Sequence, residues 1–283
     1  PMHVGYETSG MAWLSLIGFL ITGVGAPLLG LYAILLSEGN LFKFFSESSP
    51  LITGLWIAIL VLALGPIGAT PRCVLLSYQA LKSFMPGLTL PWFSLILGGV
   101  LVALTLKKTA AIDLLGKLFS PLLLVFLLSI IYFSLIHPAP ITHAEPLSWS
   151  KSITTGITEG YQTMDLLAAL IFAVTLWKIT KFYGFSKQET KKVYFYAMTL
   201  GGFLLGVIYF GLGLAAQSHE AILSTVTKDL YLNTMAYSTL GHVGGSMACL
   251  TVFLACFTTI IALLVTCCDC ALQWFEKTYE AKP

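Results

Sequence analysis

Gly160-Tyr161-Gln162-Thr163-Met164-Asp165 stands directly before an uncharged, largely apolar run, Leu166–Trp177. These twelve residues extend only about 18 Å as an α-helix, whereas a bilayer core is about 30 Å thick and needs about twenty apolar residues. The preceding stretch, 149–159, is compatible with helix and only partly apolar. We therefore predict one membrane crossing over 149–177 that consists of two half-helices and an unwound joint.

The predicted joint has a functional meaning, because unwound backbone inside a membrane is tolerated only where it lines a cavity in the protein. Transporters use such joints to hold substrates and ions. If Gly160–Asp165 is unwound, its helical hydrogen bonds should be interrupted, with Gly160 taking non-helical dihedrals and regular helix resuming by about Leu167. The alternative is an ordinary amphipathic helix whose Asp165 faces a helix bundle.

Composition places the whole chain in a membrane. Hydrophobic residues make up 57% of the 283 positions and charged residues 10%, with a mean hydropathy of +0.87. An average soluble domain carries about 25% charged residues. Six stretches without Asp, Glu, Lys or Arg each exceed the roughly 18 residues of a transmembrane helix candidate. These stretches are 8–37, 48–71, 83–106, 118–144, 193–219 and 230–268. The fold class is therefore an all-α, polytopic membrane protein, and the net charge of +2 gives no reason to expect nucleic acid.

Turn signals divide these stretches into about seven crossings that form a single transmembrane domain over 1–283. The crossings are predicted at 11–36, 50–69, 91–106, 118–136, 149–177, 194–217 and 246–268. Lys and Arg then set the orientation, because positive charge marks the cytoplasmic side. Alternate loops hold 11 of the 15 basic residues, so these loops are predicted inside and residue 1 outside. They are 37–49, 107–117, 178–193 and 269–283.

The start of the sequence is unusual for such a protein. Residue 1 is Pro, and no signal-peptide pattern precedes the first span. We therefore expect an upstream crossing that this sequence lacks, and interpret the chain as an internal fragment or a truncated product. On that interpretation residues 1–283 alone are expected to be inactive.

Sequence patterns of common enzymes are absent. The chain contains no H-E-x-x-H, no G-x-S-x-G, no P-loop and no dinucleotide fingerprint. No pair of carboxylates lies within an apolar span, so we predict that the protein is not an enzyme and has no organic cofactor. Asp165 is the only carboxylate that the predicted spans place inside the membrane, and such residues are functional candidates by default.

Gly65-Pro66-Ile67-Gly68 interrupts the second span near its predicted outer end. Proline removes a hydrogen-bond donor and strains the preceding turn, so a kink or a stop is predicted there. Arg72 follows closely, and two roles are open for it. It either meets a substrate carboxylate or reaches the outer membrane interface with its long side chain.

Ala255-Cys256-Phe257-Thr258-Thr259 places two adjacent hydroxyls in the middle of the last span. Threonine hydroxyls commonly donate to a carbonyl of their own helix, but small oxygen ligands also suit a hard cation such as sodium. The spacing leaves both alternatives open. The nearby cysteines Cys267, Cys268 and Cys270 have the composition of a redox or metal site. They lie at a predicted cytoplasmic end, in a reducing compartment, so plain helix packing is favoured.

Taken together, these residues resemble the bacterial branched-chain amino acid:cation symporter family, the BrnQ-type carriers. The resemblance covers essentially the whole chain. It rests on the motif at 160–165, on Gly65-Pro66 with Ala69-Thr70-Pro71-Arg72, on 18–22 with Gly25 and Pro27, and on 255–269. Members are similar to carriers of the inverted-repeat (5+5) sodium-symporter fold, whose first and sixth helices are broken. On that mapping the seven spans are helices two to eight of an incomplete fold, and 149–177 is helix six.

The resemblance implies sodium-coupled symport of leucine, isoleucine and valine across the bacterial cytoplasmic (inner) membrane. The implied partners are therefore the amino acid, sodium as coupling ion, and the lipid bilayer. The unwound part of helix six would contact substrate through Gly160, Tyr161, Thr163 and Asp165. Sodium would be held at Ala255, Thr258 and Thr259.

Two points stay open on the sequence. Asp165 either serves the substrate ammonium or caps the half-helix that follows it. The function is either this symport, another amino-acid transporter or exchanger of the same fold, or that of a membrane subunit or channel without coupled transport. A channel would favour repeated rings of pore-lining polar residues, and no such repeat is present.

Overall fold

In a computed structural model of the chain, the structure describes residues 1–8, 11–45, 49–82, 85, 87–105, 114–138 and 148–280. Within these ranges the chain is helical apart from short connections and contains no strand. The predicted all-α class is thus confirmed for the described part of the chain.

Five stretches are long and apolar enough to cross a membrane. The first is Ala12–Leu36, built from α2 (Ala12–Leu20), a π-helical turn η1 (Ile21–Gly25) and α3 (Ala26–Leu36). The second combines α5 (Pro50–Leu64) with α6 (Ala69–Lys82), and the third combines η2 (Leu115–Phe119) with α9 (Ser120–Ile136). The last two are α12 (Lys187–Gln217) and the stretch of η3 (Lys228–Leu230) and α14 (Tyr231–Glu280) up to Leu272.

A pair of helices with a break between them is present where the broken crossing was predicted. Helix α10 (Trp149–Gln162) and helix α11 (Asp165–Phe182) are apolar enough only as a pair, and they are bent by 41° at their junction. Counting this pair as one span gives six crossings by length and composition. The predicted seventh, 91–106, corresponds to α7 (Leu90–Thr105), a shorter apolar helix of 16 residues.

Three predicted boundaries of membrane spans are wrong, and in each case helix extends beyond the predicted boundary. Residues 70–82, predicted as loop, continue the second crossing as α6, because the chain resumes helix after the break at Gly65–Gly68. The predicted loop 218–245 holds α13 (Glu220–Leu223), η3 and the first turns of α14. Helix α14 also continues past the predicted end at 268. In each case helix occupies residues that the sequence pattern had assigned to a loop.

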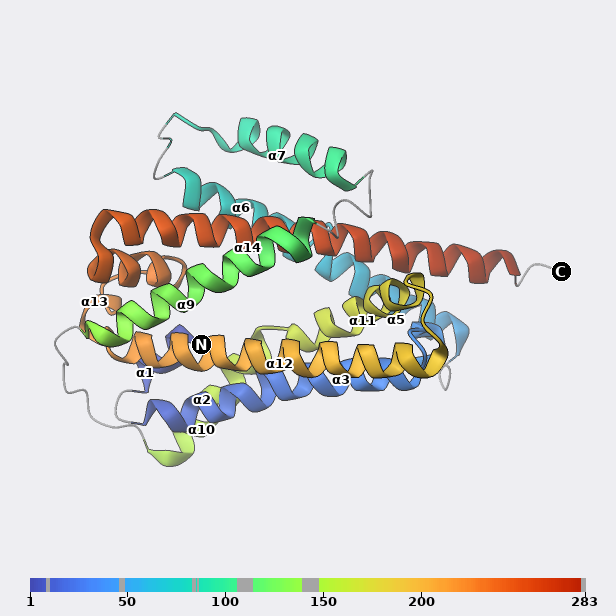
Figure 1. Cartoon of the computed structure of the whole chain (residues 1–283), viewed down its shortest axis with the longest axis horizontal. Coiled ribbons are helices and arrows are strands. Elements are labelled where there is room, and N and C mark those ends of the chain that lie inside the picture. Colours follow the sequence, from blue (N-terminus) through green and yellow to red (C-terminus); the bar gives the residue numbers. More distant parts are fainter. Residues whose placement is uncertain are drawn as a thin grey trace.

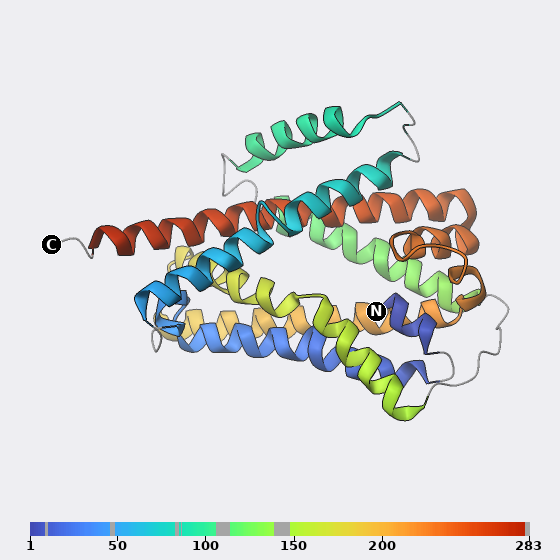
Figure 2. The same cartoon turned by 180° about the vertical axis from the view of Figure 1, so that it is seen from behind.

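The helices form an elongated bundle in which α14, beyond a break at Gly241 (φ 60°, ψ −143°), runs along the length of the molecule (Figure 1). Helices α2 and α3 lie alongside α10, α11 and α12, while α9 and α6 pack against α14. The view from behind shows α7 at one edge, next to α6 and apart from the broken crossing (Figure 2). The remaining short helices are α1 (Met2–Glu7), which packs on α12, and α4 (Leu41–Phe44).

The largest apolar core joins the broken crossing to its neighbours. Its buried side chains come from α3, α4, α5, α11, α12 and α14. Members with almost no exposed surface include Ile34, Ile57, Ile171, Val174 and Tyr194. This core fixes α11 between α3 and α14, and so fixes where the break at its N-terminal end lies.

Candidate functional site

The break between α10 and α11 consists of two residues rather than the six predicted. Thr163 still has helical dihedrals, and Met164 takes a left-handed conformation at φ 56° and ψ 21°. The Met164 N–H donates to the Tyr161 carbonyl at 3.1 Å, and regular helix resumes at Asp165. The interruption and the restart before Leu167 are as predicted, but Gly160 remains inside α10.

Gly160 therefore has a different role from the predicted one. A Cβ at this position would collide with Thr22 Oγ1 and lie 2.6 Å from the Phe19 carbonyl oxygen. Gly156, one turn earlier, would collide with the Ser15 carbonyl in the same way. These glycines let α10 approach α2 backbone to backbone, and Thr22 Oγ1 donates across the contact to the Ile157 carbonyl at 3.0 Å. Gly160 positions the break by packing, not by its dihedrals.

Asp165 is the first residue of α11, and its carboxylate points toward α12. Tyr209 Oη donates to Asp165 Oδ2 at 2.9 Å. Tyr209 belongs to helix α12, which begins with a reciprocal capping box between Ser186 and Glu189 at 3.3 and 2.9 Å. The residue at the N-cap of α11 is Met164, so the alternative in which Asp165 caps this half-helix is wrong. Its negative charge still suits the positive N-terminal end of a helix.

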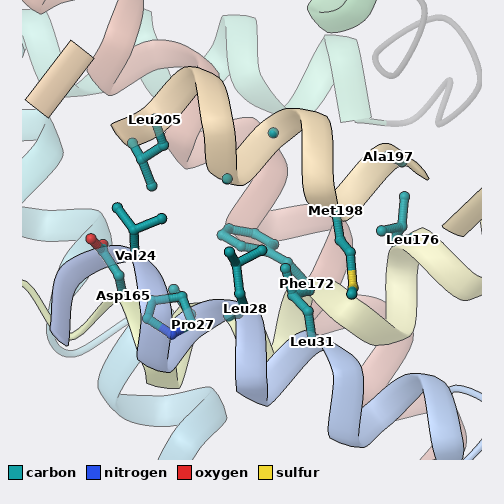
Figure 3. Close-up of a pocket in the computed structure, with 14 residues that line it drawn as sticks. Val24, Pro27, Leu28, Leu31, Asp165, Phe172, Leu176, Ala197, Met198 and Leu205 are labelled. Carbon is teal, nitrogen blue, oxygen red and sulfur yellow. The ribbon is translucent and has the colours of Figure 1, made fainter. Parts of the chain in front are cut away.

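A cavity of about 420 Å³ opens beside Asp165, between η1 and α3, α11 and α12. Among the described residues that line it, Asp165 is the one with a charge, and the others are apolar or glycine. Figure 3 shows the carboxylate at one end, near Val24 and Pro27, with Phe172 and Met198 farther along. Ligand pockets commonly enclose about 300–1,000 Å³ with few polar groups. A second hollow of about 510 Å³, between α9 and α12, has only apolar residues and glycine among its described lining.

The other three predicted substrate residues do not line this cavity. Tyr161 points away from the bundle with 75% of its surface exposed. Thr163 Oγ1 donates back to the Gly160 carbonyl at 2.8 Å, and Gly160 itself is enclosed by α2. The structure therefore brings Asp165 to the cavity and places Gly160, Tyr161 and Thr163 around the break beside it.

The predicted sodium residues lie elsewhere, in the middle of α14. Thr258 Oγ1 donates to the Ala255 carbonyl at 2.9 Å, and Thr259 Oγ1 donates to the same carbonyl at 2.7 Å. Both hydroxyls thus bond back to their own helix, while their lone pairs can still accept. In the described part of the chain, no hydrogen bond connects this segment with the break.

Sequence reasoning missed a second carboxylate. Asp269 lies within α14 and is only 2% exposed, so it is a buried carboxylate that the predicted spans did not include. Lys178 Nζ of α11 lies 3.4 Å from Asp269 Oδ1. The last predicted span ended at 268, one residue before Asp269, because the charge itself ended the apolar run. The partner of Asp269, Lys178, lies 91 positions away in the sequence, and no local pattern reveals a contact over that separation.

The remaining candidates are simpler. Arg72 is exposed on α6 and forms no ion pair with another described residue. The six cysteines carry free thiols, and Cys267 Sγ packs 3.8 Å from the Val61 carbonyl oxygen beside the break in the second crossing. Within the described ranges, no three His, Cys, Asp or Glu side chains are grouped so that they would hold a metal ion.

Comparison with known proteins places this arrangement in a family. The family described as "Branched-chain amino acid transport protein" matches residues 1–281. The chain belongs to this family. Its members are transport permeases, not enzymes.

Several members are similar to the chain over nearly all of its length. The branched-chain amino acid permease BrnQ of Lactobacillus delbrueckii subsp. lactis is 30% identical over 98% of this chain and 65% of its own length. Permease BraB of Bacillus subtilis is 29% identical over 99% of this chain and 64% of its own. BrnQ of Salmonella typhimurium is 26% identical over 99% and 65%. The chain thus spans just under two thirds of the length of these relatives, and no solved structure matches it.

Proposed function

We propose that the protein carries branched-chain amino acids through a lipid bilayer. The observation that supports this most is the family match over residues 1–281, together with relatives named as branched-chain amino acid permeases. The structure adds a broken membrane-length helix with a carboxylate at the break. Charged groups inside membrane spans are costly, and in transporters they mark substrate or ion pathways.

The cavity beside the break has the chemistry of such a substrate. The Asp165 carboxylate would bind the substrate ammonium group together with the Tyr209 hydroxyl, which lies 2.9 Å from Asp165 Oδ2. The positive N-terminal end of α11 would favour the substrate carboxylate nearby. The apolar lining from α3, α11 and α12 would receive a branched aliphatic side chain and offers no partner to a polar one among its described residues. Specificity for leucine, isoleucine and valine would follow from that lining.

We further propose that transport is coupled to sodium. The segment Ala255, Thr258 and Thr259 supports this because it resembles the A-x-x-T-[S/T] string that contributes sodium ligands in related sodium symporters. Its hydroxyl lone pairs also remain available after both protons bond to the Ala255 carbonyl. The inverted-repeat fold and the location in a bacterial cytoplasmic membrane belong to the same proposal.

Uptake of labelled leucine by vesicles that contain the protein, as its gene encodes it, tests the proposal. We expect accumulation that requires an inward sodium gradient and that unlabelled valine and isoleucine suppress. Accumulation under a proton gradient without sodium would remove the sodium assignment only. Leucine flux that needs leucine on the opposite side would indicate an exchanger, and flux of ions without leucine would indicate a channel. No leucine flux in any condition would refute the proposed function.

A further inference from the structure

Four side chains form a polar contact between α11 and α14, which we call the clamp: Thr175 and Lys178 from α11, and Thr266 and Asp269 from α14. Thr175 Oγ1 lies 3.1 Å from Thr266 Oγ1 and 3.2 Å from Asp269 Oδ2. Lys178 Nζ lies 3.4 Å from Asp269 Oδ1 and donates to the Asp269 carbonyl at 3.3 Å. Every one of these contacts joins one helix to the other.

The two threonines of the clamp behave unlike most threonines in these helices. Thr180, Thr258 and Thr259 each donate to a carbonyl of their own helix three or four residues earlier. That local bond is the usual way for a threonine to satisfy its hydroxyl in an apolar helix. The hydroxyls of Thr175 and Thr266 instead contact each other, and that of Thr175 also contacts the Asp269 carboxylate. The clamp is therefore a specific contact between helices rather than two separate local ones.

Burial makes the contact strong. The side chain of Asp269 is 3% exposed, and that of Lys178 is 35% exposed. A buried carboxylate is tolerated only when opposite charge and hydrogen-bond donors surround it, and removing one partner leaves the other unpaired. Buried apolar residues of both helices, among them Val174, Trp177 and Leu263, enclose the clamp in one core. Its interactions are thus formed where water competes little.

The clamp connects the two helices that carry the proposed binding residues. The pairs 175–266 and 178–269 share one sequence offset, so the helices run parallel here. Asp165 lies ten residues before Thr175 on α11, and Thr259 lies ten residues before Asp269 on α14. Each distance is about 15 Å along its helix. Figures 1 and 2 show α11 running away from α14 between its C-terminal half and its start at the break.

We propose that Asp269 is a positioning residue for transport: through Thr175 and Lys178 it holds α11 on α14. The clamp thereby fixes how far the substrate residue Asp165 stands from the sodium segment at Ala255–Thr259. Because α11 diverges from α14 between the clamp and the break, a small change in the angle at the clamp is enlarged over the intervening distance of about 15 Å. This inference rests on the proposed function, and it assigns to Asp269 no contact with substrate or ion.

The test measures leucine uptake at a series of sodium concentrations for the wild type and for Asp269→Asn. We expect the variant to take up leucine about tenfold more slowly at equal amounts in the membrane, because one charged hydrogen-bonded partner is lost. We also expect the sodium concentration for half-maximal uptake to rise, which a loss of folded protein alone would not cause. Lys178→Met should show the same change to a smaller degree, since Lys178 is partly exposed.

Conservative and matched variants keep the result interpretable. Asp269→Glu and Lys178→Arg retain the charges and should retain most of the uptake. If Asp269→Asn does not fold, Lys178→Met carries the test in its place. Lys181→Met and Thr180→Val remove similar groups one turn away on α11 and should leave the sodium dependence unchanged. Wild-type uptake with normal sodium dependence in Asp269→Asn would overturn this inference and leave the proposed function intact. Absence of leucine uptake by the wild type would instead refute the proposed function.

Discussion

The two ends of α11 each meet a carboxylate, and the surroundings of those carboxylates differ. Asp165 at the N-terminal end is half-buried, borders a cavity, and receives a hydrogen bond from Tyr209. Asp269 beside the C-terminal half is almost fully buried and is held by Lys178 and Thr175. The same functional group is therefore available to a ligand at one end and bound within the protein at the other. Environment, not residue type, separates a binding role from a positioning role.

The largest effect is expected at the break end, from Gly160→Val. The new side chain would collide with Thr22 and the Phe19 carbonyl, so α10 must move away from α2. Overpacking of this kind costs about 1–3 kcal/mol of stability, and it also displaces the break and Asp165. Leucine uptake should be nearly abolished, and the melting temperature of the purified protein should fall.

Gly99→Val on α7 is the matched control, because a Cβ at Gly99 meets no atom within 4 Å. That variant should retain both uptake and stability. Normal uptake by Gly160→Val would show that the close approach of α10 and α2 does not position the site.

At the other end of α11, Asp269→Asn should lower stability more than the loss of a shorter ion pair at the surface. Asp269 and Lys178 are 3.4 Å apart and mostly buried, whereas Glu38 and Lys187 are 2.6 Å apart and reach into solvent. Removing a partner from a buried pair costs up to about 3–5 kcal/mol, and the partial exposure of Lys178 reduces this. Exposed pairs are screened by water and salt, so Glu38→Gln should change the melting temperature little.

The contribution of the surface pair to stability should also depend on pH, in a direction set by the pKa of Glu38. The hydrogen bond from Lys187 lowers the pKa of Glu38 below its ordinary value of 4.5. The contribution of this pair is therefore present above the unfolded pKa and is lost as the pH falls through the folded one. At pH values above about 5 the melting temperatures of wild type and Glu38→Gln should run parallel. An equal loss of stability in Asp269→Asn and Glu38→Gln would contradict the distinction between buried and exposed pairs.

The sequence predicted the break at the N-terminal end of α11, where a local pattern marks it. It missed the buried Asp269 beside the C-terminal half, where no local pattern does. A short apolar run beside Asp165 pointed to a break, because helix length and bilayer thickness are fixed quantities. Non-helical dihedrals were predicted at Gly160, whereas Met164 adopts them, since a preference for glycine does not outweigh tertiary packing. Asp269 was left outside the last predicted span because its own charge ended the apolar pattern. Its pairing with Lys178 depends on a contact between distant segments, which composition and spacing do not contain.

A smaller effect is expected from the hydroxyls of α14. Thr258→Ala combined with Thr259→Ala should raise the sodium concentration for half-maximal uptake several-fold while leaving insertion unchanged. The physical reason is that both side chains have lone pairs for a cation, although their protons bond to the Ala255 carbonyl. Thr258→Ser combined with Thr259→Ser keeps both oxygens and serves as the control. Unchanged sodium dependence in the alanine variant would remove the sodium assignment from this segment.

The smallest effect concerns Met164. A non-glycine residue in the left-handed region costs about 1 kcal/mol, so Met164→Gly should remove strain at φ 56°. Glycine also gains freedom in the unfolded chain, which offsets part of the benefit. The melting temperature should therefore change by about one or two degrees, with uptake retained. A large loss of uptake would show that the Met164 side chain itself takes part in transport.

The most direct test of the binding role of Asp165 compares two ligands on two proteins. Leucine carries an ammonium group, and 4-methylpentanoate has the same branched chain and carboxylate without it. Equilibrium binding of both is measured on the purified wild type and on Asp165→Asn, which keeps the size of the side chain. If Asp165 receives the ammonium group, the substitution should weaken leucine binding about tenfold or more and leave the binding of 4-methylpentanoate nearly unchanged. Equal losses for both ligands, or unchanged leucine binding, would contradict the account.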